Sequence, residues 1–184
     1  MQSLKGQLLI AAPSLTSSFF RRTVILMLDH TEEGAAGVIL NRPTEATVTH
    51  IAETIFSESF NWDKSLSLGG PVSGPLMILH EVEEQSDLEI FPGLFNAVEI
   101  SKVRDLILSR TEPSMILANY SGWGPGQLEG EFGVDSWLTL PATREYVFWE
   151  GTGDLWDTVV KAVNARQLSD FLGLREVPSD PTLN

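Results

Sequence analysis

Three short segments of the chain combine glycine or proline with polar residues, and each follows a predicted strand. They are Asn41-Arg42-Pro43, Gly69-Gly70-Pro71, and the stretch Ser121-Gly122-Trp123-Gly124 with Gln127 and Glu131 just beyond it. If the three strands end at the same edge of a sheet, these turns meet around one ligand-sized cleft. In the alternative interpretation they are simply turns, because tight turns need glycine and proline for backbone reasons.

The third segment has the order of a phosphate-binding loop, but its residues argue against one. Residues 115–118 predict a buried strand, and a helix is expected from Gln127 onward. A phosphate loop presents free backbone N–H groups at the start of a helix. Pro125 lacks that group, Glu129 and Glu131 would repel an anion, and no lysine follows the glycines. We predict instead a tight turn that seats Trp123 against the body of the protein.

Nucleophilic hydrolysis is the second chemistry that these residues suggest. Ser73 and Ser121 lie in glycine-rich turns, but the chain has no G-x-S-x-G motif. Glu129 and Glu131 are two residues apart and would point in different directions on a helix, which makes them a poor acid/base pair. We expect Glu131 to approach the cleft and Glu129 to be a helix-start residue. A hydrolase that uses Asn41, Ser121 or Glu131 therefore stays an alternative to simple binding.

Histidine and cysteine give little support for metal chemistry. His30, His50 and His80 are 20 and 30 residues apart, without the close spacing of common metal motifs. We predict that a histidine at the end of a strand bonds a nearby backbone carbonyl. The chain has no cysteine, which excludes disulfides, thiolate catalysis and cysteine metal sites. We predict no metal and no cofactor.

The charge of the chain restricts its partners. With 25 acidic and 12 basic residues the net charge is −13, and such a surface opposes the phosphate backbone of nucleic acids. No apolar run approaches the roughly 18 residues of a membrane helix. The run at residues 8–12 is also shorter than the apolar core of a signal peptide. We predict a cytoplasmic protein that binds no membrane and no nucleic acid directly.

The predicted elements alternate irregularly along 184 residues, a length typical of one domain. We expect one domain over residues 1–184 with a frayed tail at 175–184, and an α+β fold, because repeating βαβ units are missing. The strands are expected at 6–12, 23–28, 36–40, 66–68, 76–79, 88–91, 115–118, 136–140 and 146–149. The helices are expected at 44–57, 101–110 with Ser101 as N-cap, from 127, at 154–163 and at 167–174, with a short turn capped by Ser17 or Ser18.

Several of these segments also resemble the YqgE/AlgH family of bacterial proteins. The resemblance is carried by GQLLIAAP at 6–13, His30, GAAGVILNRP at 34–43, Gly69-Gly70-Pro71-Val72, Leu79-His80, GWGPGQLE at 122–129 and Trp137. The match runs from residue 6 to about 140 in the correct order. It implies a compact α+β domain with a curved, barrel-like mixed sheet flanked by helices. The family has no established biochemical activity, and some members are labelled as transcriptional regulators.

The chain departs from the family pattern at two places. Asn119 and Ser121 stand where the family usually has glycine and alanine, and Leu28-Asp29 precedes His30 where a cysteine–glutamate pair is common. We therefore expect a non-enzymatic regulatory or binding protein whose cleft takes a small ligand or a protein partner. The hydrolase is the alternative, and direct DNA binding comes last because of the acidic charge.

Overall fold

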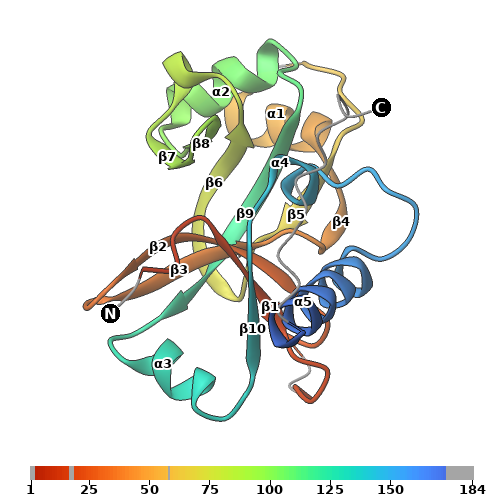
Figure 1. The fold of residues 1–184 in the computed structure, drawn as a ribbon. Coiled ribbons are helices and arrows are strands. Elements are labelled where there is room, and N and C mark those ends of the chain that lie inside the picture. Colours follow the sequence, from red (N-terminus) through yellow and green to blue (C-terminus); the bar gives the residue numbers. More distant parts are fainter. Residues whose placement is uncertain (1–2, 17–18, 58, 173–184) are drawn as a thin grey trace.

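The computed structural model describes residues 3–16, 19–57 and 59–172, and Figure 1 shows how their elements are arranged. The strands are β1 (Gln7–Ala11), β2 (Val24–Thr31), β3 (Gly34–Ile39), β4 (Pro43–Thr47), β5 (Ser65–Leu68), β6 (Val72–His80), β7 (Leu88–Phe91), β8 (Leu94–Ala97), β9 (Ser114–Trp123) and β10 (Trp137–Pro141). The helices are α1 (Val48–Phe56), α2 (Ile100–Leu108), α3 (Gln127–Phe132), α4 (Arg144–Val147) and α5 (Leu155–Phe171), with a short 3-10 helix at Glu83–Gln85.

The strands form one curled sheet whose main order is β10-β1-β2-β3-β9-β6-β8-β7. β4 joins it through β5, and β5 runs parallel to β9, whereas the other described pairings are antiparallel. The sheet curls into a half-barrel with helices beside it (Figure 1). The predicted α+β class with a curved, mixed sheet is therefore confirmed.

The central strands are buried on both faces, which explains their nearly continuous apolar sequence. Leu8 and Ile10 of β1 face one core cluster, beneath α4 and α5. Leu9 and Ala11 face a second cluster on the side of α3. Burying one large apolar side chain stabilises a fold by about 1.5–3 kcal/mol relative to leaving it exposed. The two faces of β1 therefore fasten helices to both sides of the sheet.

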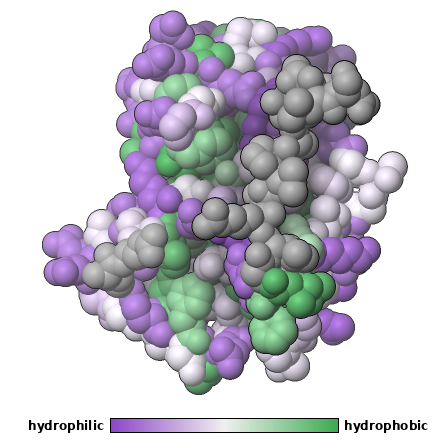
Figure 2. Space-filling model, in the orientation of Figure 1, coloured by the Kyte–Doolittle hydropathy of each residue, from purple (hydrophilic) through white to green (hydrophobic). Residues whose placement is uncertain are grey.

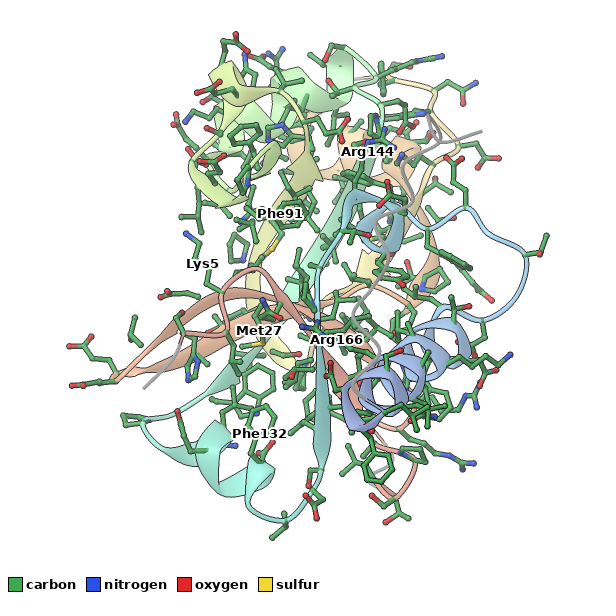
Figure 3. The ribbon with its side chains drawn as sticks, viewed as in Figure 1. Lys5, Met27, Phe91, Phe132, Arg144 and Arg166 are labelled. Atoms are coloured by element: carbon green, nitrogen blue, oxygen red, sulfur yellow. The ribbon has the colours of Figure 1, made fainter. Side chains whose placement is uncertain are left out.

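The second cluster lies between α3 and the β2–β3–β9 part of the sheet. Met27 of β2 belongs to its buried part, and Phe132 of α3 packs against it. Figure 3 shows these two side chains in the same region between sheet and helix. A third cluster joins α1 and α2 to the other end of the sheet. Among the described residues, no helix has both the length and the apolar content needed to cross a bilayer.

Several predicted elements are confirmed, and others are wrong. The β2–β3 hairpin forms, and β7 is an edge strand at the end of the sheet order, as predicted. Residues 146–149 were expected to be a strand, but the segment turns into helix α4, which buries Val147. Such a short apolar run is compatible with either period, and packing against the sheet decides it. The predicted tail at 175–184 and the turn capped by Ser17 or Ser18 lie outside the described residues.

Three helix starts and ends also differ from expectation. The first residues of the predicted helix at 44–57 form β4, because they find a partner strand in β5. The helix at 154–163 continues through the predicted turn at 167–174 as far as Phe171. The predicted N-cap Ser101 lies inside α2, whose N-cap is Glu99. The backbone N–H groups of Val98 and Glu99 donate to the Asp87 carboxylate instead, each at 2.7 Å.

The largest difference concerns the glycine-rich run. It was expected to be a loop from residue 119, but β9 continues through Trp123 and only Gly124-Pro125-Gly126 turns the chain into α3. Gly122 lies opposite Ala36 and Ser121 lies opposite Gly37 in the pairing with β3. The glycines therefore serve a sheet with small residues on neighbouring strands, a pattern that is indistinguishable from a loop when the sequence is considered alone.

Candidate functional site

A row of small residues crosses β2, β3 and β9 on one face of the sheet. Asp29 of β2 lies opposite Ala36 of β3, and Ala36 lies opposite Gly122 of β9. Residues directly opposite each other in an antiparallel pair point to the same face. Because two of the three have almost no side chain, the sheet is hollowed at this row.

The hollow is an open groove of about 490 Å³, and it is referred to below as the groove. That volume is within the range of ordinary ligand sites. The groove is lined by Asp29, Thr31, Glu33, Gly34, Ala35, Ala36, Val72, Tyr120, Gly122 and Trp123. The β2–β3 hairpin, which carries many of these residues, lies on the left of Figure 1.

Tyr120 forms one wall of the groove, and two glycines make room for its ring. A Cβ added to Gly74 would lie 2.7 Å from the ring, and one added to Gly122 would lie 3.1 Å from it. The first distance is too short for any side chain and the second is tighter than most contacts, so the ring packs against bare backbone at both glycines. The position of the Tyr120 ring therefore depends on glycine at both positions.

Asp29 owes its place in the groove to an irregularity in β2. The pairing with β3 shifts between Met27 and Asp29, so that Leu28 is an extra residue. With strict alternation Asp29 would share the face of Met27, beneath α3. The bulge reverses the alternation, as such insertions do, and turns Asp29 outward and His30 inward. Asp29 is exposed and His30 is buried.

The groove is acidic. Asp29 and Glu33 are its charged residues, and the ten lining residues include no lysine, arginine or histidine. Within the described part of the chain, neither carboxylate has an ion-pair partner; the Asp29 carboxylate accepts a hydrogen bond from the backbone N–H of His30 at 3.0 Å. The tip of the hairpin that carries Glu33 is hydrophilic in Figure 2. The groove thus presents two carboxylates without a compensating cation.

The opposite face of the same strands is fastened to α3 by Glu131. Its Oε2 atom accepts hydrogen bonds from the indole N–H groups of Trp123 at 3.0 Å and Trp137 at 2.7 Å. Its Oε1 atom accepts from the Gln127 amide at 3.2 Å. Trp123 was predicted to lie in a loop, but it lies on strand β9. Its indole stacks on Phe20, and the residue is only 6% exposed. Glu131 joins α3 to β9 and β10.

A second contact between α3 and the sheet involves His30. The backbone N–H of Leu4 donates to Nδ1 at 3.2 Å, so the neutral ring carries its proton on Nε2 and donates it to Glu129 at 2.9 Å. The pKa of Glu129 is lowered by a backbone hydrogen bond and by this bond from His30. Glu129 is thus a histidine partner as well as a residue of the first helical turn.

The predicted bonding of the strand-end histidines to a backbone carbonyl is wrong. His30 and His80 each accept a backbone N–H on Nδ1, His80 from Val82 at 3.1 Å. Burial lowers the pKa of His80. His50 is exposed on α1. Among the described residues, no group of three or more histidines and carboxylates is arranged to hold a metal ion.

The segment Gly69-Gly70-Pro71 carries the chain across β9. β5 pairs with one edge of β9 and β6 with the other, so the connection must pass over the strand. A Cβ on Gly70 would collide with the peptide between Tyr120 and Ser121. The Ser121 hydroxyl, fully buried, donates to the Gly69 carbonyl at 3.2 Å. Glycine is needed here for close approach of two backbones.

The segment Asn41-Arg42-Pro43 fastens the loop before β2. The Asn41 amide accepts from the N–H of Val24 at 2.9 Å and donates to the Arg22 carbonyl at 2.8 Å. The Arg42 guanidinium donates to the carbonyl groups of Phe19 and Arg21 in the same loop. Pro43 begins β4 and is exposed.

The predicted site residues therefore divide among four places. Gly122 and Trp123 line the groove. The crossing over β9 is made by Gly69, Gly70 and Ser121. The contact with α3 includes Gly124, Gln127 and Glu131. The loop before β2 is held by Asn41 and Arg42. Sequence reasoning missed Asp29, Glu33, Ala36 and Tyr120. The run of small residues from Gly34 to Gly37 was a signal, but its meaning required the register with β9.

The chain is similar to known proteins of one family. A family model described as AlgH-like matches residues 8–167. UPF0301 proteins from Chlamydia caviae and Myxococcus xanthus are each 34% identical, over 98% and 89% of this chain and 95% and 92% of their own lengths. A UPF0301 protein from Chlorobium limicola is 38% identical over 85% of both chains.

Two solved structures are similar in fold. The solution structure of the AlgH protein from Pseudomonas aeruginosa has a TM-score of 0.75 and 27% identity, covering 95% of both chains. A crystal structure of a protein from Corynebacterium diphtheriae has a TM-score of 0.69 and 23% identity, covering 85% of both chains, and its likeness concerns the fold alone.

Proposed function

Since the chain belongs to the AlgH-like family, we propose a function from the groove that its own residues build: it is a non-enzymatic binding protein that takes a ligand or a segment of a partner in the groove between Asp29 and Tyr120. The observation that carries the proposal is the floor of Gly34, Ala36 and Gly122. Because these residues carry almost no side chain, the space beside the Tyr120 ring stays open on an exposed sheet face.

The hydrogen bonds of Asn41, Ser121 and Glu131 support binding over the hydrolase alternative. Asn41 bridges two backbone groups, Ser121 donates to the Gly69 carbonyl, and Glu131 accepts two indole N–H groups. A nucleophile and its base need to reach each other and a substrate. These side chains are instead committed to separate contacts within the fold.

The charge of the chain supports a protein or small-molecule partner over nucleic acid. A net charge of −13 repels phosphate backbones, so any regulatory role would act through a partner. The cytoplasmic location expected from the sequence stays a prediction.

The first test is whether the groove binds anything. A library of small organic molecules and short peptides is added to ¹⁵N-labelled protein, and the amide resonances are followed by NMR. We expect at least one compound to shift the amides of Gly34 and Gly122. Ala36→Leu should abolish the response, because its isobutyl group extends into the groove.

Ala165→Leu is the matched control, since Ala165 is exposed on α5, away from the groove. It should bind as the parent protein does. If no compound shifts the groove amides, or if Ala36→Leu binds as well as Ala165→Leu, the groove is not a binding site and the proposal is wrong.

A further inference from the structure

We propose that the groove receives the side chain of a lysine or arginine from a partner polypeptide, an inference that rests on the binding function proposed above. Three observations meet in the groove: two carboxylates without a described cation, an aromatic wall, and a floor of residues with almost no side chain. Each fits a different part of a long basic side chain.

The carboxylates fit the charged head. Asp29 comes from β2 and Glu33 from the adjoining turn of the hairpin, so they lie on the same rim of the groove. Thr31, between them in the chain, adds a hydroxyl to the same lining. An ammonium or guanidinium group donates several hydrogen bonds, and its positive charge would compensate the two carboxylates. An anionic ligand would be repelled by both.

The wall and floor fit the aliphatic stem. Lysine and arginine bury their methylene groups along apolar surface while the charged head reaches polar groups. Tyr120 and Val72 offer that surface, and the small side chain of Ala36 leaves room beside it. A cation that passes over the Tyr120 ring also gains from the electron-rich face of the ring.

The openness of the rim favours a side chain presented by a polypeptide. Asp29, Thr31, Glu33 and Gly122 are all exposed, so the groove is not closed over its contents. A polypeptide can lie along such a rim and insert one side chain. The net charge of −13 also steers basic partners toward the protein and keeps acidic ones away.

The test compares pentapeptides with blocked ends, Gly-Gly-Xaa-Gly-Gly, in which Xaa is lysine, arginine, norleucine or glutamate. Binding is measured from the shifts of the Gly34 and Gly122 amides at low salt. The lysine and arginine peptides should bind, whereas the norleucine peptide, which has the stem without the charge, and the glutamate peptide should not. Raising the salt concentration should weaken binding, because the contact is exposed.

The double variant Asp29→Asn/Glu33→Gln should weaken binding of the basic peptides about tenfold, as expected from the loss of two exposed ion pairs. Glu83→Gln/Glu84→Gln is the control: it changes the net charge equally on exposed residues outside the groove, and should change the affinity less than about twofold. If both double variants weaken binding equally, only the overall charge acts and the inference is wrong.

Other outcomes separate the two proposals. If the norleucine or glutamate peptide shifts the groove amides as strongly as the lysine peptide, the groove binds ligands but the inferred preference for a basic side chain is wrong. If free spermidine binds as tightly as the basic peptides and shifts the same amides, the occupant is a free cation and the inferred polypeptide partner is wrong. If neither these probes nor the library shifts the groove amides, both proposals fail.

Discussion

At the scale of single residues, several acids hold the fold together from positions that look like catalytic candidates. Glu131 is the clearest case, because its carboxylate accepts the N–H groups of both Trp123 and Trp137. Both indoles are nearly buried, with 6% and 5% exposure. Their N–H groups would have no equivalent acceptor if the carboxylate were removed.

We therefore predict that Glu131→Ala destabilises the protein by about 2–4 kcal/mol, since hydrogen bonds to a charged acceptor contribute about 1.5–3 kcal/mol each and the site is partly open to water. Glu131→Gln keeps one acceptor oxygen and should cost less. Urea unfolding followed by tryptophan fluorescence measures both. Glu84→Ala, on an exposed residue, serves as the control, and equal stability of Glu131→Ala and this control would contradict the role assigned to Glu131.

Asp87 is the second structural acid, and its effect depends on pH. Burial acts to raise its pKa, but the hydrogen bonds from Lys102 and from the N–H groups of Glu99 and Val98 outweigh it and lower the pKa to about 2. The folded protein therefore binds this proton less readily than the unfolded chain. The stability that Asp87 contributes is present above about pH 4 and is lost as the pH falls toward about 2.

We predict that Asp87→Asn is less stable than the parent protein at pH 5 and that the difference narrows between about pH 4 and pH 2. Urea midpoints across this range measure the difference. Asp63→Asn, on an exposed residue, serves as the control. A gap for Asp87→Asn that stays constant down to pH 2 would show that the carboxylate does not anchor the start of α2 in this way.

At the scale of elements, the connection from β5 to β6 is the most constrained part of the chain. Gly69 passes over the Asn119 carbonyl and Gly70 over the peptide between Tyr120 and Ser121, and no side chain fits at either position. Pro71 follows at once, which limits the backbone further. The placement of β6 beside β9, and with it Val72 beside Tyr120, depends on this crossing.

Gly70→Ala should destabilise the protein by about 1–3 kcal/mol, in the range of an overpacked core, because the added Cβ meets backbone that cannot move aside. Gly130→Ala is the matched control: no atom lies within 4 Å of its added Cβ, and it lies in α3. That substitution should leave stability unchanged or raise it by up to about 1 kcal/mol. Thermal unfolding compares the two, and equal melting temperatures would show that the crossing tolerates a side chain.

The sequence was informative where one local pattern sufficed. Apolar runs located β1, β2, β9 and α5. Burial on both faces of a strand produces a continuous apolar run, and burial of one helix face produces apolar residues at helical spacing. Partners that are distant in the chain could not be inferred. His30 and Glu129 are 99 residues apart, and the groove depends on a register between β3 and β9. A glycine in a paired strand and a glycine in a loop look the same until the neighbouring strand is known.

At the scale of the whole molecule, the two faces of the curled sheet differ in the β2–β3–β9 region. One face of the β2–β3–β9 region packs against α3 through Glu129, Glu131 and an apolar cluster. The other face is open and acidic at the groove. Substitutions on the groove face should therefore change binding without unfolding the protein, and substitutions beneath α3 should do the reverse.

The extra residue at Leu28 has a consequence for the design of variants. Because Leu28 has no partner in β3, deleting it would leave a regular ladder in which Asp29 still lies opposite Ala36 and His30 still lies opposite Ala35. The groove would keep its acid, and α3 would keep the ring that bonds Glu129. Leu28 is therefore the position at which β2 can be shortened by one residue without exchanging its two faces.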